Sequence, residues 1–368
     1  MTVSLRTTPL ADEHRRLGAR MGPFAGFLMP MQYAGIVAEH EAVRTRAAVF
    51  DTCHMGQLLV RGPTALADLE MLVTCDLAAL APGQCRYGLL CNADGGVLDD
   101  LVVYRLAAQE FLLVVNAANQ AADFAWLRRH IAGSTLVEDR SPTTAKIDLQ
   151  GPWAPRIART LVTAALYELR YYHFTETRYG EHAVLLSRTG YTGEIGYEVY
   201  GPPAAIRAFW RDCLAAGAVP AGLGARDTLR LEMGMPLYGH ELTADRNAAE
   251  AGPVRALAPH KPFIGAAAVR DPARIRARLT GLVLEDRRAA RQGDAVYAAE
   301  GRQVGTVTSG SYAPSLGRAV ALAYLEVGAD SAGAPVTIRA QRYTLAARVT
   351  QPPFYRQGTA RRPVTDFL

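Results

Sequence analysis

The stretch at residues 85–119 reads CRYGLLCNADGGVLDDLVVYRLAAQEFLLVVNAAN, and it carries the clearest structural signal in the chain. Three apolar runs rich in Val, Leu and aromatic residues are separated by two short polar segments. The first segment, Asn92 to Gly96, has the residue types that tight turns require. We therefore predict three consecutive antiparallel strands.

Helical and extended segments alternate on both sides of this stretch. We expect helices over 8–20, 36–46, 64–74, 120–130 and 203–216, another that begins near Asp227, and a Gly-, Pro- and Met-rich loop between the first two. In the first helix, Glu13 should face water together with its charged neighbours. Strands are expected near 144–149, 183–187 and 195–200, and only short strands follow residue 276, which indicates a small barrel or sandwich. The fold class is α+β.

Composition limits the classes of function. The chain has 368 residues, 49% of them apolar and 20% charged, which predicts two or three globular domains. The 40 basic and 35 acidic residues are scattered, without the clustered basic stripe of a nucleic-acid binder. A net charge of +5 still suits an anionic small ligand or an acidic protein partner.

Cysteine and histidine spacing gives no sign of a disulfide framework or a metal site. The five cysteines are an odd set without a C-x-x-C pair, and the eight histidines lack zinc-site spacing. The first twenty residues lack the apolar core of a signal peptide, and no run of eighteen apolar residues occurs. We expect a cytoplasmic protein with no metal, nucleic-acid or membrane partner.

The first candidate for chemistry is the acidic pair Asp99-Asp100 inside an apolar strand. Successive strand residues point to opposite faces, so Asp100 shares a face with Val102 and Tyr104, and Asp99 with the other set. At least one carboxylate should then lie in apolar surroundings and need a partner. The alternative is an edge hairpin with both acids in water.

The second candidate is SRTGYTGEIGYE at 187–198. Its three glycines would let the backbone approach a ligand, with Tyr191 as a stacking face and Glu198 as an acceptor. The alternative is that the glycines serve only the turn.

The third candidate is GLGARD at 222–227. Here Arg226 would precede a helix N-terminus and could hold an anion. The alternative is that Arg226 forms a structural ion pair and that Asp227 is the N-cap of the helix. The adjacent Cys53 and His54 are a weak candidate, since neighbours in sequence rarely face each other.

Many ordered segments together resemble the T-protein family of the glycine cleavage system, over most of the chain. They are TPLADEHRRLGARMGPFAG, MQYAGIVAEHEAVRTRAAVFDTCHMG, NADGGVLDDLVVYR, LLVVNAAN, LQGP, SRTGYTGEIGYEV, GLGARDTLRLEMGMPLYGHEL, TSGSYAPSLGRAVALAYL and PPFYR. The resemblance implies three domains in a cloverleaf-like arrangement around a central folate funnel, with a C-terminal all-β barrel. The implied limits are 1–54 plus 142–245, 55–141, a connector at 246–275, and 276–368.

The resemblance also implies an activity and its partners. An aminomethyl group on the lipoyl arm of H protein would be transferred to tetrahydrofolate, which yields methylenetetrahydrofolate, ammonia and the dihydrolipoyl arm. The protein would be a monomer. Asp100 matches the family's key carboxylate, which would orient the folate nitrogen and stabilise a cationic iminium. The residues that match the family's folate pocket are Met55, Tyr87, Val102, Tyr104, Asn116, Tyr172, Tyr191, Glu198 and Arg226.

Three segments depart from the family's pattern. FAGFLMP at 24–30 lacks a usual tryptophan and an acid, EAGPVRALA at 250–258 lacks a tryptophan and a lysine beside the funnel, and Trp153 stands where lysine is common. These departures keep two alternatives open. One is a tetrahydrofolate-dependent demethylase of a small amine, sulfonium or aryl ether, and the other is a folate-binding protein without catalysis.

Overall fold

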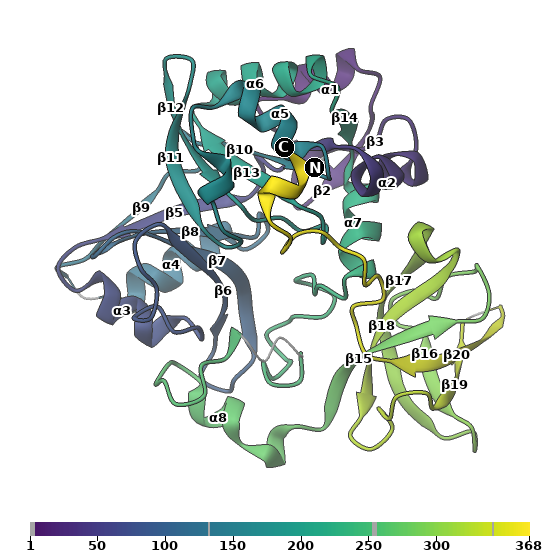
Figure 1. Ribbon diagram of the computed structural model, residues 1–368. Coiled ribbons are helices and arrows are strands. Elements are labelled where there is room, and N and C mark those ends of the chain that lie inside the picture. Colours follow the sequence, from purple (N-terminus) through teal and green to yellow (C-terminus); the bar gives the residue numbers. More distant parts are fainter. Residues whose placement is uncertain (1–3, 132, 252–255, 341) are drawn as a thin grey trace.

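The computed structural model describes residues 4–131, 133–251, 256–340 and 342–368. Figure 1 shows three lobes: two are mixed helix and sheet, and the third, formed by residues 277–350, is a barrel. This arrangement confirms the α+β class and the C-terminal barrel. Residues 252–255 of the departing segment lie outside the described residues.

The first lobe contains a five-stranded sheet in the order β6-β7-β8-β5-β9. Its strands are β5 (Gly56–Arg61), β6 (Gln84–Cys91), β7 (Val97–Ala107), β8 (Glu110–Val115) and β9 (Leu136–Asp139). One face packs on α3 (Ala65–Leu72) and α4 (Gln120–His130) around Leu69, Leu101, Val103 and Leu127. The three strands predicted from residues 85–119 are therefore confirmed, and β7 lies inside the sheet, between β6 and β8.

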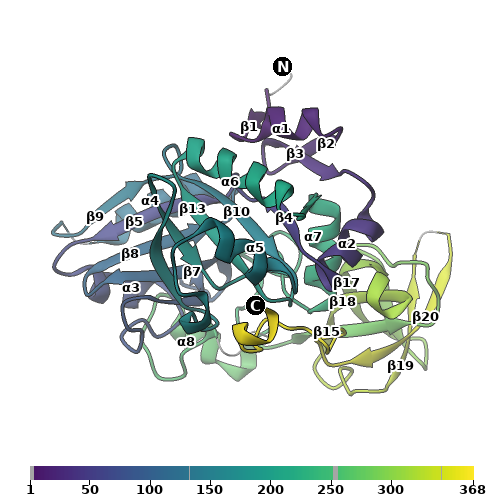
Figure 2. The ribbon, with the colours of Figure 1, turned by 45° about the horizontal axis from the view of Figure 1, so that its top comes forward.

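The second lobe contains a six-stranded sheet in the order β11-β12-β13-β10-β4-β14. The strands are β4 (Ala48–Asp51), β10 (Ala145–Gln150), β11 (Phe174–Tyr179), β12 (His182–Ser187), β13 (Gly196–Gly201) and β14 (Val219–Ala221). Helices α5 (Ala154–Leu161) and α6 (Pro203–Ala215) cover one face around Ile147, Val199 and the buried Trp210, as Figure 2 shows from above.

The other faces of the two sheets meet. Tyr104 and Val114 of the five-stranded sheet lie in one apolar cluster with Phe174 and Tyr200 of the six-stranded sheet. The face of β7 that carries Asp100 and Tyr104 is thus directed toward a second sheet rather than toward water.

The N-terminal region differs from the prediction in two respects. The helix expected over 8–20 is only α1 (Ala11–Arg16), and the expected loop is a hairpin of β2 (Arg20–Phe24) and β3 (Phe27–Gln32), with β1 (Arg6–Thr7) beside β3. Glu13 is buried rather than solvated, because Arg211 of α6 and Arg16 both bind its carboxylate.

The helix expected to begin near Asp227 begins earlier, as α7 (Leu223–Glu232), with Gly222 at its N-cap. Arg226 therefore lies within the helix, and Asp227 is not a cap but a partner of Arg230, at 2.8 Å. Helix α7 packs on α2 (Ile36–Thr45), which agrees with the predicted helix over 36–46.

The barrel is closed in the order β15-β18-β17-β16-β19-β20. Its strands are β15 (Ala277–Leu284), β16 (Ala295–Ala298), β17 (Gln303–Ala313), β18 (Arg318–Glu326), β19 (Pro335–Arg339) and β20 (Thr344–Thr350). It docks on α7, where the buried Arg230 donates to Glu241 at 3.0 Å and to Ser309 of β17 at 2.8 Å. Short helices complete the chain: α8 (Ala266–Arg270), η1 (Leu166–Glu168), η3 (Pro272–Arg274), η4 (Pro314–Leu316) and η5 (Val364–Phe367).

Candidate active site

Asp100 is held on β7 by two side chains from the neighbouring strands. The Tyr87 hydroxyl of β6 donates to Asp100 Oδ2 at 3.1 Å, and Asn116 Nδ2, just after β8, donates to Oδ1 at 2.8 Å. Asp99 and Asp100 pair with β6, and neither carboxyl group is exposed, so the alternative of an edge hairpin with both acids in water is wrong. Asp99 is fully buried on the opposite face, and Asp100 is half-buried.

The surroundings of Asp100 favour its protonated form more than water does. Burial, together with the nearby Asp99 charge, raises the pKa of Asp100 to about 7, although the hydrogen bonds from Tyr87 and Asn116 act in the other direction. A carboxyl group that titrates near neutral pH can both accept and return a proton. Asp100 is therefore equipped for general acid-base chemistry.

Glu198 lies on β13 and faces the five-stranded sheet. It belongs to an ion network that was not predicted from the sequence. Its Oε1 accepts from Lys146 Nζ at 2.9 Å, and its Oε2 accepts from the hydroxyls of Tyr104, Thr189 and Tyr200 at 3.0, 2.7 and 3.1 Å. A carboxylate offers about four acceptor sites. Three of the four donors lie on Oε2, whereas Oε1 accepts only from Lys146 among the described residues.

Lys146 and Arg226 both bind Asp148, which lies opposite Glu198 in the β10–β13 pairing. Lys146 Nζ lies 2.6 Å from Asp148 Oδ1, and Arg226 Nη1 lies 2.7 Å from Oδ2. The structural ion pair that was the alternative for Arg226 exists, and its partner is Asp148. Lys146, Asp148 and Gln150 share one face of β10, and the other face is apolar, a pattern that could have revealed this pair from sequence.

Tyr191 lies beside this network. The guanidinium of Arg226 is 4.9 Å from the centre of its ring, and its hydroxyl donates to the carbonyl oxygen of Pro236. The ring can still present a flat apolar surface, as the sequence analysis proposed.

The glycines of the 187–198 segment are required by packing against the protein itself. A Cβ on Gly190 would lie 2.1 Å from Gln150 Oε1, and one on Gly196 would lie 2.5 Å from the carbonyl oxygen of Leu149. Gly193 has φ +82° and faces Met233. These glycines are therefore explained by close packing against Gln150, Leu149 and Met233, and not by the turn alone.

The remaining predicted residues belong to one apolar cluster. Met55, Val102 and Tyr172 pack in the cluster that also contains Tyr104. Consequently the structure brings all ten predicted residues to one region between the two sheets. The structure gives no support to Cys53 and His54 as a nucleophile and base. The Cys53 thiol donates to the Lys146 carbonyl oxygen, and burial lowers the pKa of His54 to about 4.

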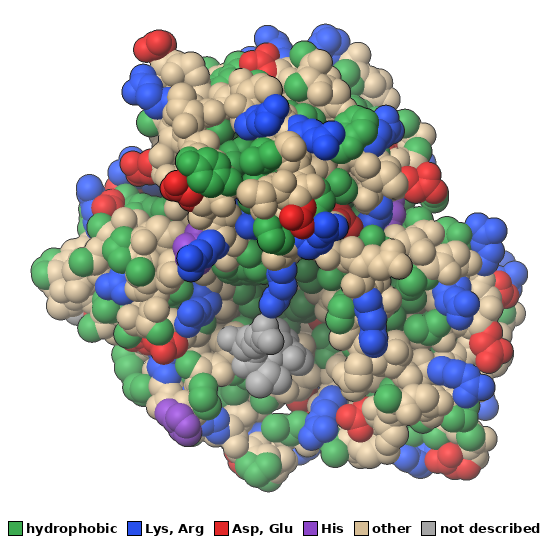
Figure 3. Space-filling view, in the orientation of Figure 1, with side chains coloured by type: hydrophobic (Ala, Val, Ile, Leu, Met, Phe, Trp, Pro, Cys, Tyr) green, Lys and Arg blue, Asp and Glu red, His purple; other side chains and the backbone are tan. Residues whose placement is uncertain are grey.

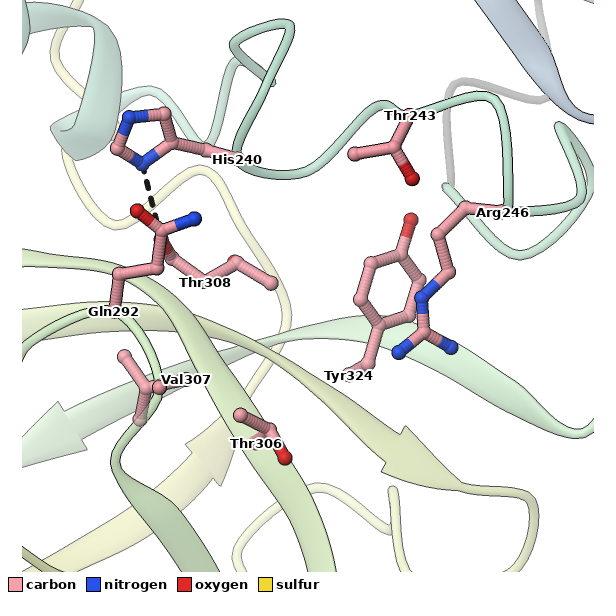
Figure 4. A pocket seen from close by; sticks show the side chains of 9 residues that line it. His240, Thr243, Arg246, Gln292, Thr306, Val307, Thr308 and Tyr324 are labelled. Atoms are coloured by element: carbon pink, nitrogen blue, oxygen red, sulfur yellow. Dashed lines mark hydrogen bonds between the residues drawn. The ribbon is translucent and has the colours of Figure 1, made fainter.

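The molecular surface is hollowed where the three lobes meet, and basic side chains border this hollow (Figure 3). A separate pocket of about 240 Å³ lies between the barrel and the segment after α7, and His240, Arg246 and Tyr324 line it (Figure 4). None of the ten predicted residues lines this second pocket.

Metal-binding clusters and membrane-spanning helices are both absent from the described part of the chain. In those residues no group of three or more His, Cys, Asp or Glu side chains is arranged to hold a metal ion. No helix in the same residues has both the length and the apolar character to cross a bilayer.

Comparison with known proteins identifies the family. Residues 10–261 match the model of the GCVT N-terminal domain, and residues 278–356 match the glycine cleavage T-protein C-terminal barrel domain. A Rubrobacter xylanophilus protein named aminomethyltransferase is 46% identical over 359 residues, which cover 96% of this chain and 95% of the relative. A Moorella thermoacetica protein of the same name is also 46% identical, over 96% of this chain and 98% of its own.

A solved structure agrees with the sequence matches. The glycine cleavage system aminomethyltransferase T from Bartonella henselae superposes with a TM-score of 0.91 at 34% identity, over 97% of this chain and 99% of that one. Both lobes and the barrel are thus shared. The chain belongs to the glycine cleavage T-protein family.

Proposed function

We propose that this protein is an aminomethyltransferase, which transfers the methylene group of an aminomethylated lipoyl arm to tetrahydrofolate and releases ammonia. Family membership over nearly the full length supports this reaction class. The observation that carries the chemistry is the Asp100 carboxyl group, which is half-buried, held by Tyr87 and Asn116, and titrates near neutral pH.

In the proposed reaction Asp100 moves and stabilises charge. A folate nitrogen attacks the methylene carbon and displaces the lipoyl sulfur as a thiolate. Asp100 accepts the proton of the attacking nitrogen and returns it to the amine, which leaves as ammonia and produces a cationic iminium that the Asp100 carboxylate stabilises. The second folate nitrogen then closes the ring on the same carbon, and its proton passes to the thiolate of the dihydrolipoyl arm. Tyr87 and Asn116 fix the direction in which its oxygens point.

The space between the sheets is the proposed folate pocket. Met55, Val102, Tyr104, Tyr172 and Tyr191 supply apolar and aromatic surface for a pterin and its benzoyl group. Glu198 would read a donor edge of the ring through the second acceptor site of Oε1, or by exchanging one of the three hydroxyl donors on Oε2. Arg226 is constrained too, since Asp148 already binds it.

We also propose that lipoylated H protein delivers the arm, that the protein acts as a cytoplasmic monomer, and that the domain limits given above apply. The net charge of +5 would steer an acidic carrier protein and an anionic folate alike.

The test combines purified protein, tetrahydrofolate and aminomethylated, lipoylated H protein, and it follows methylenetetrahydrofolate and ammonia together. Both products should form, and only with tetrahydrofolate present. Asp100→Asn should abolish most of the turnover, while Asp94→Asn, a change to an exposed acid in the turn of the same hairpin, should not. Folate binding without either product would contradict the proposal, and methylated amines and sulfonium compounds would then be tested as donors.

A further inference from the structure

Two more carboxyl groups lie behind Asp100. Asp99 has 0% exposure, and it accepts hydrogen bonds from the Asn116 backbone N–H at 2.9 Å, from Asn116 Nδ2 at 2.8 Å and from Asn119 Nδ2 at 2.7 Å. Asp123, in the first turns of α4, is 2% exposed, and its buried Oδ2 accepts no hydrogen bond from any donor in the described residues. The same Asn116 amide that holds Asp99 also holds Asp100 at 2.8 Å.

Asp123 lies one helical turn after Asn119: its backbone N–H donates to the Asn119 carbonyl oxygen at 2.8 Å, and the Asn119 side chain donates to Asp99. The two carboxyl groups therefore share one buried cluster, where each acts on the other as a hydrogen-bond partner. Two carboxylates both accept and neither donates, so this contact requires one proton between them. Among the described residues, Asp100 on β7 and Tyr238 after α7 also act on the pair, and no Lys, Arg or His side chain forms an ion pair with either acid. The N–H donors can stabilise one negative charge on Asp99, and a shared proton removes the second charge.

We propose that Asp123 is a positioning residue whose protonated carboxyl group donates to Asp99, so that the pair presents one negative charge behind Asp100. The proposal deepens the assigned function, because it rests on the role of Asp100 in the transfer. Through the charge of the pair, a residue of α4 would affect the pKa of Asp100 without contacting the Asp100 carboxyl group.

The donors decide which acid carries the proton. Three N–H groups point at Asp99 and stabilise its ionised form, whereas Asp123 receives none. Burial and the nearby Asp99 raise the pKa of Asp123 to about 10. The charge that remains on Asp99 is one of the causes that raise the pKa of Asp100 to about 7.

The first experiment is the pH dependence of methylenetetrahydrofolate formation in matched variants. Asp123→Asn keeps a neutral donor toward Asp99, so the inflection near pH 7 should move by less than about 0.3 pH unit. Asp99→Asn removes the charge, so the inflection should move to lower pH by about 1 to 2 pH units. If Asp123→Asn moves the inflection as far as Asp99→Asn does, then Asp123 is ionised and the proposal is wrong.

The second experiment does not depend on catalysis. The folded protein holds the Asp123 proton up to about pH 10, while the unfolded chain releases it near its ordinary pKa of about 3.9. Wild-type folding therefore loses up to about tenfold in equilibrium constant for each pH unit between these values, and Asp123→Asn does not. The difference in Tm, variant minus wild type, should grow steadily from pH 5 to pH 9.

The control for both experiments is Asp139→Asn, which removes an exposed carboxylate that binds Gln120 at the start of α4. It should change neither the inflection nor the pH dependence of Tm. A constant Tm difference between Asp123→Asn and wild type over this pH range would overturn the proposal even in a protein without transferase activity. If no carrier supports the transfer, the proposed function is wrong. A Tm difference that grows with pH would still show, independently, that Asp123 holds the proton.

Discussion

Replacing Lys146 by Met tests how much the ion network of Lys146, Asp148 and Glu198 contributes to the stability of the folded protein. The ammonium group is 1% exposed and lies 2.6 Å from Asp148, 2.9 Å from Glu198 and 3.2 Å from the Thr52 hydroxyl. After Lys146→Met, Asp148 still has Arg226 at 2.7 Å, whereas Glu198 keeps only hydroxyl donors. The substitution thus leaves one buried charge without a cation.

Removing one partner of a buried ion pair costs about 3 to 5 kcal/mol, and the remaining hydroxyl donors place the expected loss at the lower end, about 3 kcal/mol. For a chain of 368 residues that unfolds as one unit, that loss corresponds to a fall in Tm of roughly 4 °C, measured by circular dichroism or calorimetry. Adding Glu198→Gln to Lys146→Met removes the uncompensated charge, so the double variant should recover at least half of the loss.

The matched control is Arg61→Met, which removes an exposed cation 4.0 Å from Glu138 and should cost less than about 0.5 kcal/mol. Two outcomes would refute the reasoning. In the first, Lys146→Met melts as the control does. In the second, the double variant is less stable than Lys146→Met, which would mean that the Glu198 charge is compensated without the lysine.

Three further outcomes follow from the site and its supporting loop. Asp100→Asn should slow the transfer by about 10² to 10⁴-fold with folate still bound, and the wild-type rate should rise as the pH passes through about 7, since the carboxylate is the base; a rate independent of pH from 5.5 to 8.5 would contradict this role. Tyr87→Phe removes a donor that favours the ionised form of Asp100, so the inflection should move to higher pH by up to about 1 pH unit, and a shift to lower pH would exclude this account. Gly193→Ala should lower stability by about 2 to 4 kcal/mol, because a Cβ would lie 2.3 Å from Met233 Sδ at φ +82°; Gly180→Ala, at φ +54° with no atom within 4 Å, should cost only about 1 kcal/mol, and equal melting temperatures of the two variants would show that the contact with Met233 is harmless.

Much of the local structure could be read from the sequence, because it depends on short-range patterns. The helix at 120–130 and the three strands within 85–119 follow from hydrophobic spacing and turn residues, and α4, β6, β7 and β8 agree with them. The β2–β3 hairpin was missed, because Gly, Pro and Met, which are typical of loops, pair there through backbone hydrogen bonds.

The start of α7 was missed for a related reason. The N-cap is Gly222, whereas Asp227 has the residue type that caps prefer, so a search by residue type selected the wrong position.

By itself, the sequence determined that Asp99 and Asp100 point to opposite faces of one strand, because that alternation is a property of the extended backbone. It could not say which face meets α3 and α4 and which meets the six-stranded sheet, because apolar residues lie on both. Only the tertiary structure decided that Asp99 is buried with Asp123, that Asp100 faces the second sheet, and that Lys146 reaches Glu198 across 52 residues of chain. The strength of a hydrogen bond or a charge interaction depends on the distance between the two groups in space. For residues far apart in the chain, that distance is set by how their segments pair in the folded protein.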